Sequence, residues 1–430
     1  MARVEFTLIE SARPGLMRLA RDVVPDMTTP RPPYLAVAVT GAGWHPLAWR
    51  EPDARPAELL SAKYWTEVVG VADRARIDLV TIADTFRRRP PTTDDIDRPI
   101  SELAAGRLDS VLVASRVAPT TAHVGLLPTV IATHTEPFHS AKAIATLDYV
   151  GRARAGVTVD VAAGAVEARL FGRRTLPTDV HRRDDELFAE ATEYAEVLRR
   201  LWDSWEDDAE IRDVETGRFV DRDKLHYIDF EGRFFSVRGP SITPRPPQGR
   251  PVVAAATTSA AASVAFAGAS ADIAFVGAHD RVAAARAVDA VRAAQSTAGR
   301  DGDTVHVFAD LLVHLDDRES AAADRRARLD LGLGTPYTGG TPVFAGTVAG
   351  LADLIAELTD PAVGVTGIRL RTATIPHDLL QITTRLVPEL ERRKLFRVSD
   401  TTSTLRDRLG LGTAANRYTR TSATTGGARQ

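Results

Sequence analysis

The stretch PVVAAATTSAAASVAFAGASADIAFVG (251–277) has the pattern of one strand–helix–strand unit. Two short runs, 251–257 and 271–277, are continuously apolar, as expected of parallel strands that are covered on both faces. Between them, the alanine-rich segment 260–268 is typical of a helix. The stretch therefore predicts the βαβ unit from which parallel α/β folds are built.

The same unit repeats along the chain. Apolar runs bounded by turn residues recur, and segments with helical periodicity lie between most of them. In one of these segments the large apolar side chains from Leu187 to Trp205 fall on a single stripe. The repetition predicts a (β/α)8 TIM barrel over residues 34–397, between an N-terminal extension (1–33) and a C-terminal tail (398–430). The eight predicted strands are 34–39, 77–84, 122–127, 155–163, 251–257, 271–277, 305–315 and 367–371.

Two intervals are too long to be simple connections between strand and helix. Residues 206–250 follow the fourth predicted strand and its helix, and they contain an alternating segment, FEGRFFSVRG, followed by a proline-rich connector. Residues 316–345 follow the seventh strand and combine a charged helix with a Gly/Thr/Pro-rich run. Long insertions in barrel enzymes usually shape the mouth, so we expect both to lie there. After residue 412 the composition predicts a mobile tail.

Composition excludes several classes of function. The formal charge is −3 and charges of both signs are interspersed, so neither nucleic acid nor an anionic membrane is an expected partner. The chain has no cysteine, which excludes disulfides and thiolate chemistry, and no histidine pair has the spacing of a metal motif, so we expect no metal. No secretory signal and no apolar run of membrane-spanning length are apparent, so a cytoplasmic location is expected.

Several motifs occur together and in order. They include WHPLAWR (44–50), IDLVTIAD (77–84), the run 124–148, WDSWEDDA (202–209), FFSVRGP (234–240), PPQGRPVV (246–253) and VPELERRKLFR (387–397). Together they resemble the nitrilotriacetate, pristinamycin and dibenzothiophene-sulfone monooxygenase branch of the bacterial luciferase-like flavin enzymes, and the resemblance covers roughly residues 34–412. Such enzymes are TIM barrels that use O₂ and reduced FMN delivered by a separate reductase, and they are usually dimers or tetramers.

The resemblance implies a set of cofactor-binding residues. Asp84 and Thr129, at the ends of the second and third predicted strands, would lie against the isoalloxazine edge. Without the resemblance, Asp84 could equally be a helix cap or an arginine partner. The hydroxyl row Thr257, Thr258 and Ser259 precedes a helix, and backbone N–H groups at a helix start suit the FMN phosphate. The alternative is that Thr258 or Ser259 only caps that helix.

Three positions depart from the family pattern. Val157 and Thr158 stand where the family usually has Trp-Asn on the fourth strand, so Thr158 is left as the candidate flavin contact. Leu187 and Phe188 replace an Arg-Tyr pair expected near the phosphate. Ala255 to Ser259 replace a Gln-Ala-Gly-Ser-Ser turn, with Thr257 in place of a glycine that allows close approach to phosphate. If each change costs about 1 kcal/mol, flavin affinity falls by about a hundredfold or more.

Three histidines are expected near the mouth. His45 lies in the WHPLAWR motif and could donate to a peroxide or position the substrate, and His139 and His377 are placed beside it. Of these, His45 and His139 are the catalytic candidates. A single histidine is more often a structural residue with satisfied hydrogen bonds, and that alternative stays open for all three.

The sequence supports three functional hypotheses. The first is a two-component monooxygenase that uses reduced FMN and O₂ on a small organic substrate, with a separate flavin reductase and a homodimeric or homotetrameric assembly. The second keeps the barrel and uses the deazaflavin F420 for hydride transfer. The third is a barrel without cofactor that serves as a binding or partner subunit. The changed flavin contacts motivate the last two.

Overall fold

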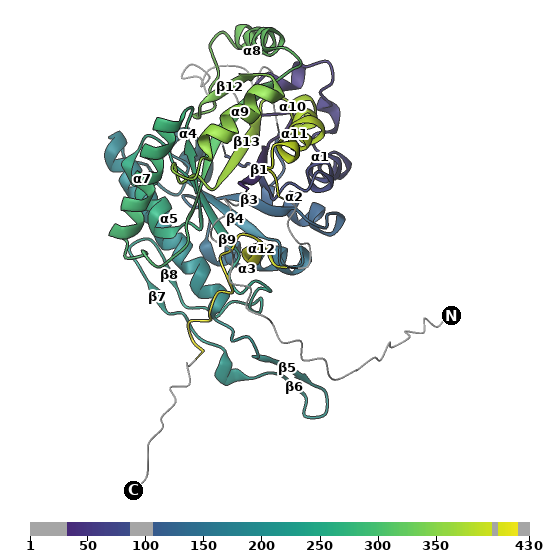
Figure 1. The fold of residues 1–430 in the computed structure, drawn as a ribbon. Helices are drawn as coiled ribbons and strands as arrows, with labels where there is room; N and C mark the ends of the chain where they lie inside the picture. The colour runs from purple at the N-terminus through teal and green to yellow at the C-terminus, as the bar shows by residue number, and fades with distance from the viewer. Residues whose placement is uncertain (1–31, 87–105, 398–402, 420–430) are drawn as a thin grey trace. The chain divides into compact units, whose positions relative to one another are not determined.

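The computed structural model describes residues 32–86, 106–397 and 403–419. The predicted extension up to residue 31 and the end of the predicted tail lie outside these residues. Within them, eight parallel strands form a ring, so the predicted TIM barrel is confirmed (Figure 1). The strands are β1 (Tyr34–Val39), β2 (Leu79–Ile82), β3 (Gly125–Ile131), β4 (Gly156–Asp160), β9 (Val252–Ala256), β10 (Ile273–Gly277), β11 (His306–Leu315) and β13 (Gly367–Thr372).

The ring closes through parallel pairing of its first and last strands. Tyr34 of β1 is in register with Gly367 of β13, which also pairs with Phe308 of β11. β10 completes the circle by pairing with both β9 and β11. Parallel strands around one axis bring all their carboxyl ends to one end of the barrel, which we call the carboxyl end, and all their starts to the opposite, amino end.

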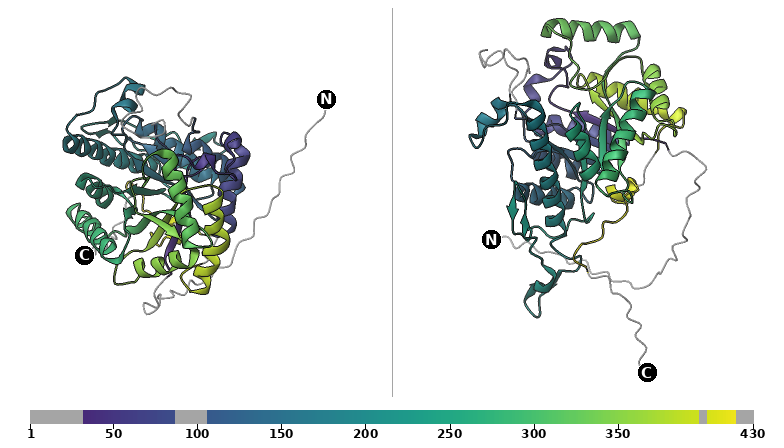
Figure 2. Two further views of the ribbon diagram at one scale, coloured as in Figure 1. Left: turned by 90° about the horizontal axis from the view of Figure 1, so that it is seen from above. Right: turned by 90° about the vertical axis from the view of Figure 1, so that its left-hand side faces the viewer.

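Helices surround the strands, as the view from above in Figure 2 shows. The stripe predicted on the long helix is present, because Leu187, Tyr194 and Leu198 of α5 are buried. Among the described residues no helix has the length and apolarity needed to cross a membrane. The helices are α1 (Ala62–Arg74), α2 (Ser110–Val117), α3 (Pro137–Val150), α4 (Ala165–Phe171), α5 (Val180–Asp203), α6 (Ala261–Ser270), α7 (Arg281–Thr297), α8 (Glu319–Leu333), α9 (Val348–Leu358), α10 (His377–Gln381), α11 (Val387–Arg392) and α12 (Leu405–Arg408).

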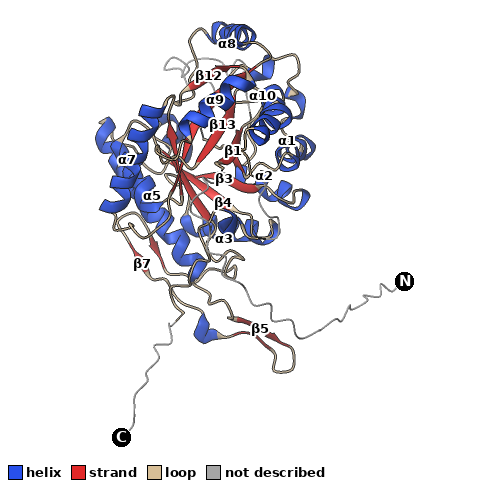
Figure 3. Cartoon of the chain, viewed as in Figure 1, coloured by secondary structure: helices blue, strands red, loops and turns tan. Residues whose placement is uncertain are grey.

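The first insertion lies at the amino end, so the expectation that it shapes the mouth is wrong. It joins the end of α5 to the start of β9, and the start of every barrel strand is at the amino end. Figure 3 shows its strands below the barrel, away from α8. Its elements are β5 (Glu210–Asp213) paired with β6 (Arg218–Val220), and β7 (Phe230–Glu231) paired antiparallel with β8 (Ser236–Val237).

The proline-rich connector after β8 crosses the amino end of the barrel and is fixed there by Gln248. Its backbone N–H and side-chain amide donate to the buried carboxylate of Asp148, at 3.0 and 2.5 Å. Burial raises the pKa of Asp148 to about 6 although these donors lower it. The Gln248 carbonyl oxygen accepts from the backbone N–H of Arg406 at 3.0 Å. The connector therefore links α3, the barrel and α12.

Residues 403–419 are packed against the barrel. Leu405 is buried beneath Leu79 and Gly125 at the amino end. The Asn416 amide donates to the carbonyl oxygens of Asp203 and Trp205 at 3.0 and 2.7 Å. The expectation of a mobile tail after residue 412 is therefore wrong up to residue 419, because these polar contacts were invisible in its composition.

The second insertion lies at the carboxyl end and adds one strand that the sequence did not predict. β12 (Val343–Gly346) pairs with the last four residues of β11 outside the closed ring. The Thr341 hydroxyl donates to the carbonyl oxygen of Asp310 at 2.7 Å. α8 and β12 therefore lie over the end of the barrel where the strands terminate (Figures 1 and 2).

Candidate functional site

Asp84 follows β2 and anchors the start of α2. Its Oδ2 accepts from the backbone N–H of Ser110 at 3.0 Å and its Oδ1 from that of Thr85 at 2.7 Å. Burial raises the pKa of Asp84, and these donors counteract the shift. Ser110 in turn donates its hydroxyl to the carbonyl oxygen of Thr129 at 2.7 Å. The structure thus brings Asp84 and Thr129 together through Ser110.

Thr129 and Thr158 are register partners on β3 and β4, at the carboxyl end of the barrel. Both face the interior, because Val130, Val157 and Val159 on the alternate positions pack toward the helices. Both threonines are buried. The Thr158 hydroxyl has no hydrogen-bond partner within the described part of the chain. An unpartnered buried hydroxyl at this position is a candidate ligand contact.

Asp160 ends β4 and carries a carboxylate at the same end of the interior. Its side chain is exposed, unlike the other residues of that strand. The surrounding protein nonetheless raises its pKa by desolvation, against the opposing charges of Arg371 and Arg369. The side chain is therefore accessible to solvent although protein surrounds it. Sequence reasoning missed this residue.

The interior also holds a buried charge cluster formed by Asp310 on β11 and by Arg369 and Arg371 on β13. Arg369 donates from Nε and Nη2 to the two carboxylate oxygens, at 2.8 and 2.6 Å. Arg371 donates to the same carboxylate from Nε at 2.9 Å and from Nη2. Burial alone would raise the pKa of Asp310, but the two guanidinium groups outweigh it and lower the pKa to about 2. Asp310 is ionised under ordinary conditions.

The sequence contained a signal for these arginines that was not used. GIRLR (367–371) is a short buried strand, and charges two residues apart on such a strand must share one face. Ile368 and Leu370 pack toward the helices, so Arg369 and Arg371 point into the barrel. A charged pair facing a barrel interior at the carboxyl end is a functional indication in this fold.

The predicted hydroxyl row follows β9, as expected, but its first members are engaged locally. Thr258 donates its backbone N–H to Ser263 at 2.8 Å, and its hydroxyl accepts from the N–H of Ala260 at 3.1 Å. The N-cap of α6 is Ala260, so neither Thr258 nor Ser259 caps the helix as the alternative expected. Thr258 and Ser259 are exposed. Thr257 lacks a positive φ, so its backbone does not require the family's glycine.

His45 is buried on the other side of the mouth. Its Nδ1 accepts from the backbone N–H of Leu47 at 3.1 Å, which leaves the proton on Nε2, 3.3 Å from Asp330 of α8. Asp330 also accepts from the N–H of Tyr337 at 2.8 Å. These contacts tie the loop after β1 to the second insertion. The proposed proton-donating role of His45 stays a prediction.

The other two predicted histidines lie apart from the threonines. His139 is exposed on the first turn of α3. His377 begins α10, with Nε2 2.9 Å from the carbonyl oxygen of Leu315. Two histidines that sequence reasoning missed are more deeply buried: His134 stacks on Phe171, and His314 has no hydrogen-bond partner for either ring nitrogen among the described residues. No residue pattern distinguished these two.

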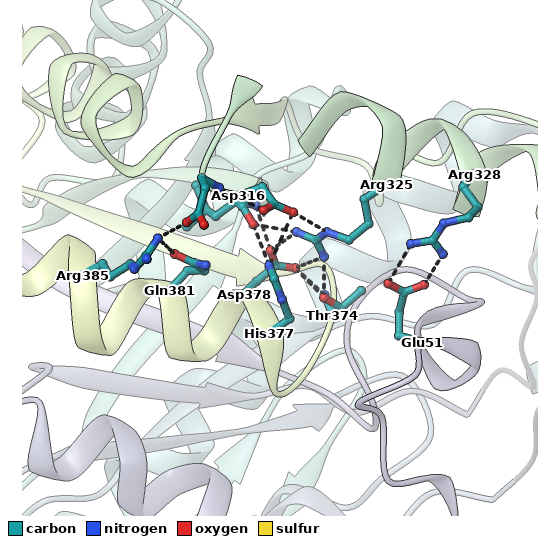
Figure 4. Close-up of polar contacts among 11 residues, drawn as sticks. Glu51, Asp316, Arg325, Arg328, Thr374, His377, Asp378, Gln381 and Arg385 are labelled. Atoms are coloured by element: carbon teal, nitrogen blue, oxygen red, sulfur yellow. Dashed lines mark hydrogen bonds and ion pairs between the residues drawn. The ribbon is translucent and has the colours of Figure 1, made fainter. Parts of the chain in front are cut away.

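Two ion pairs hold α8 over the carboxyl end (Figure 4). Arg325 donates to both oxygens of the buried Asp378, at 2.7 and 3.3 Å, and to the Thr374 hydroxyl at 2.7 Å. Arg328 donates to the two oxygens of Glu51, at 2.7 and 3.2 Å. In Figure 4 both arginines extend from one helix toward partners in two other parts of the chain. Ion pairs to two other segments of the chain therefore fix the position of α8.

Within the described residues, no group of histidine and carboxylate side chains could hold a metal ion. The chemistry available at the carboxyl end comes from hydroxyls, carboxylates and guanidinium groups. One side of the mouth is formed by the consecutive neighbours β2, β3, β4 and β9. Asp84 and the hydroxyl row follow β2 and β9, and Thr129 and Thr158 lie on β3 and β4. Asp310, Arg369 and Arg371 line the other side.

Comparison with known proteins agrees with this architecture. The chain is 36% identical over 222 residues to nitrilotriacetate monooxygenase component A of Aminobacter aminovorans, covering 51% of this chain and 48% of the relative. It is 30% identical over 280 residues to dibenzothiophene-sulfone monooxygenase of Rhodococcus erythropolis, covering 65% of this chain and 60% of the relative. The matches thus span less than two thirds of either relative.

Solved structures extend the likeness to nearly the whole barrel. The crystal structure of a long-chain alkane monooxygenase superposes with a TM-score of 0.76 at 24% identity, covering 89% of this chain and 96% of that one. At this identity the likeness shows the fold alone. The model of the luciferase-like monooxygenase family matches residues 44–360. The chain therefore belongs to the luciferase-like monooxygenase family.

Proposed function

We propose that the protein is the oxygenating component of a two-component monooxygenase that uses reduced FMN and O₂ to oxidise a small organic molecule. The observation that carries the proposal is the family match across the barrel, together with the buried, unpartnered Thr158 hydroxyl at its carboxyl end. The relatives named above are monooxygenases of small organic compounds. A separate flavin reductase and a homodimeric or homotetrameric assembly are parts of this proposal.

The residues present fit a flavin, although with fewer contacts than the family pattern. Thr129 and Thr158 would meet the isoalloxazine edge, since both face the interior and Thr158 has a free hydroxyl in the described chain. The phosphate would lie at the start of α6, where Ser259 forms no hydrogen bond with other described residues. Thr258 contributes less, because its N–H and hydroxyl are engaged with Ser263 and Ala260.

When bound, reduced FMN supplies the electrons for activation of O₂. The chain's own residues orient the ligands and limit water at the carboxyl end. Asp84 fixes the start of α2 beside Thr129, so this side of the mouth is held in place. α8 and the segment around Gly339 cover the other side, where Arg371 donates to the carbonyl oxygen of Gly339 at 2.9 Å.

A second candidate is an F420-dependent oxidoreductase. It stays open because the N–H of Thr258 is engaged with Ser263, which weakens the FMN phosphate site that the first proposal requires. An F420-dependent tetrahydromethanopterin reductase has the same fold, with a TM-score of 0.56 at 15% identity, which carries no functional information. A barrel without cofactor remains the third reading, in which neither flavin binds.

The deciding experiment is a titration of the full chain with oxidised FMN, and anaerobically with reduced FMN and reduced F420. Micromolar binding of reduced FMN, followed by O₂ consumption coupled to substrate loss when a reductase is added, is the expected result. Binding of F420 alone, with hydride transfer in the absence of O₂, would replace the first proposal by the second. Binding of neither cofactor at hundreds of micromolar would support the third.

Asp84 offers a residue-level test of the same proposal. Asp84→Ala is expected to abolish turnover, because it removes both the carboxylate and the anchor of α2. Asp84→Asn keeps one acceptor oxygen for that anchor and loses the charge, so the pair separates a chemical role from a structural one. Full turnover in both variants would remove Asp84 from the site.

A further inference from the structure

The charges in contact within the barrel interior do not balance. Arg369 and Arg371 both bind the one carboxylate of Asp310, and each is at least nine-tenths buried. Among the described residues neither arginine forms an ion pair with a second acid. Asp160 influences both electrostatically, but no ion pair joins it to either. The two buried guanidinium groups therefore share one directly bonded carboxylate, and Asp160 supplies a second negative charge without contact.

Both guanidinium groups are held in fixed orientations. The Arg369 group lies 3.6 Å above the ring centroid of Phe275, and the Arg371 group lies 4.5 Å from that of Trp44. Asp310 holds the Nε and Nη2 side of each group. A guanidinium fixed by stacking and by a carboxylate loses little freedom when it binds a further planar anion.

Hydrogen-bond donors remain after these contacts are counted. A guanidinium carries five N–H donors. The Nη1 of Arg369 forms no hydrogen bond with any other described residue, and the Nη1 of Arg371 donates to Gly339 alone, at 2.9 Å. The two arginines therefore keep N–H donors that no described residue uses.

We propose that Arg369 and Arg371 recognise a carboxylate or sulfonate group of the substrate inside the carboxyl end of the barrel. The identification of this ligand as the substrate rests on the proposed monooxygenase function. Asp310 is then a positioning residue, which aligns both guanidinium groups without touching the ligand. Asp160 lies across the barrel and carries a negative charge, so it opposes binding of the anionic group.

The anionic group belongs to the substrate rather than to the cofactor phosphate, because the two sites are separate. The phosphate site proposed above is at the start of α6, outside β9, whereas the arginines project into the interior from β13. A planar carboxylate also matches the flat, stacked guanidinium groups. The same geometry suits a sulfonate, which presents three oxygens of equal charge.

The test is calorimetric titration of the full chain with succinate and ethanesulfonate, each compared with the neutral succinamide. The charged probes are expected to bind at least tenfold more tightly than succinamide. Arg369→Gln and Arg371→Gln should each weaken succinate binding at least tenfold, while leaving Asp310 paired with the remaining arginine. Equal affinity for succinate and succinamide would overturn the proposal.

Two further variants keep the result interpretable if an arginine variant fails to fold. Asp160→Asn removes an opposing charge from an exposed side chain and should tighten succinate binding severalfold; no gain would count against the proposal. Arg392→Gln removes a positive charge from the exposed face of α11 and serves as the control for net charge. A loss of succinate affinity in Arg392→Gln equal to that in the interior variants would also overturn the proposal.

The same variants separate this proposal from the proposed function. If reduced FMN does not bind but succinate binds through the arginines, the monooxygenase assignment fails and the anion site stands. If the arginine variants lose FMN but not riboflavin or succinate, the arginines serve the cofactor phosphate and the substrate proposal fails. If FMN binds normally in all variants and only succinate is lost, both stand.

Discussion

Two buried aspartates, one at each end of the barrel, are each surrounded by arginines. Asp203, at the end of α5, binds Arg245, Arg250 and Arg417 at the amino end. Two of these arginines have a second acid, since Arg245 lies 2.7 Å from Asp207 and Arg417 lies 3.0 Å from Glu196. Asp310, in contrast, binds Arg369 and Arg371, for which the described chain offers no second ion pair.

The difference shows how similar residues serve two purposes. Around Asp203, acids and bases are close to equal in number, and the cluster joins α5, the proline-rich connector and the C-terminal segment. The Asp203 cluster therefore stabilises the amino end of the barrel. Around Asp310 two arginines share one directly bonded carboxylate, and donors remain unused. An arrangement of that kind is expected where a ligand completes the set.

The largest effect is expected from removing the central acid of each cluster. Asp310→Ala should lower the free energy of unfolding by about 3–5 kcal/mol, because it leaves two buried guanidinium groups without a carboxylate. Asp203→Ala should cost a similar amount. Urea denaturation measures both. We assign the Asp203 cluster a structural role alone. A change in succinate affinity in folded Asp203→Ala would therefore contradict the difference drawn between the two clusters.

Two histidines on β11 extend the comparison. His306, at the amino end, has both ring nitrogens within hydrogen-bond distance, with Nε2 2.7 Å from the Leu409 carbonyl oxygen and Nδ1 3.2 Å from the Thr366 hydroxyl. His314, at the carboxyl end, has neither nitrogen partnered among the described residues, and burial lowers its pKa to about 4. Of these two histidines, His314 therefore has the greater free-energy cost of protonation in the folded state.

His314 should make stability fall as the pH falls from 6.5 toward 4. In this window the unfolded chain, with a histidine pKa near 6.5, binds the proton that folded His314 does not. A shift of this size corresponds to about 2 kcal/mol lost between pH 7.5 and pH 5. In His314→Leu the pH dependence should be flatter by that amount, as measured by urea denaturation at each pH. His279→Asn, at an exposed position, should leave it unchanged.

Arg371→Met tests whether the second arginine of the Asp310 cluster contributes to stability. The substitution leaves Asp310 paired with Arg369 alone. Stability should therefore change by less than about 1 kcal/mol, or increase, because replacing buried charge by an apolar group of similar length is often neutral. A loss above 3 kcal/mol in thermal or urea denaturation would show that Arg371 is structural, as the arginines around Asp203 are.

The smallest effect on stability is expected at Thr158. Thr158→Val removes a hydroxyl without a partner in the described chain, so stability should stay within about 1 kcal/mol of the native protein. The affinity for reduced FMN should nonetheless fall about fivefold, through loss of about one net hydrogen bond. Anaerobic titration measures it. Unchanged affinity would place the flavin contact elsewhere, with Thr129 as the next candidate.

The repeated apolar runs were enough to predict the barrel, because burial on both faces requires each strand to be apolar along its whole length. The order of the motifs was likewise enough to indicate the family. The position of the first insertion was misjudged, because length and composition do not say at which end of a barrel an insertion emerges. The end of the barrel at which this insertion emerges is set by its place between the end of α5 and the start of β9.

The sequence by itself thus determined the eight strands and the buried stripe of α5, both of which depend on local periodicity, and its resemblance to a family indicated the threonines at the strand ends. Only the tertiary structure decided that Asp310, Arg369 and Arg371 meet around one carboxylate, with Asp160 and Thr158 opposite them. These residues are up to 213 positions apart in the chain, from Thr158 to Arg371. Closure of the ring alone brings their strands to face one another, and charge balance is a property of such neighbours in space.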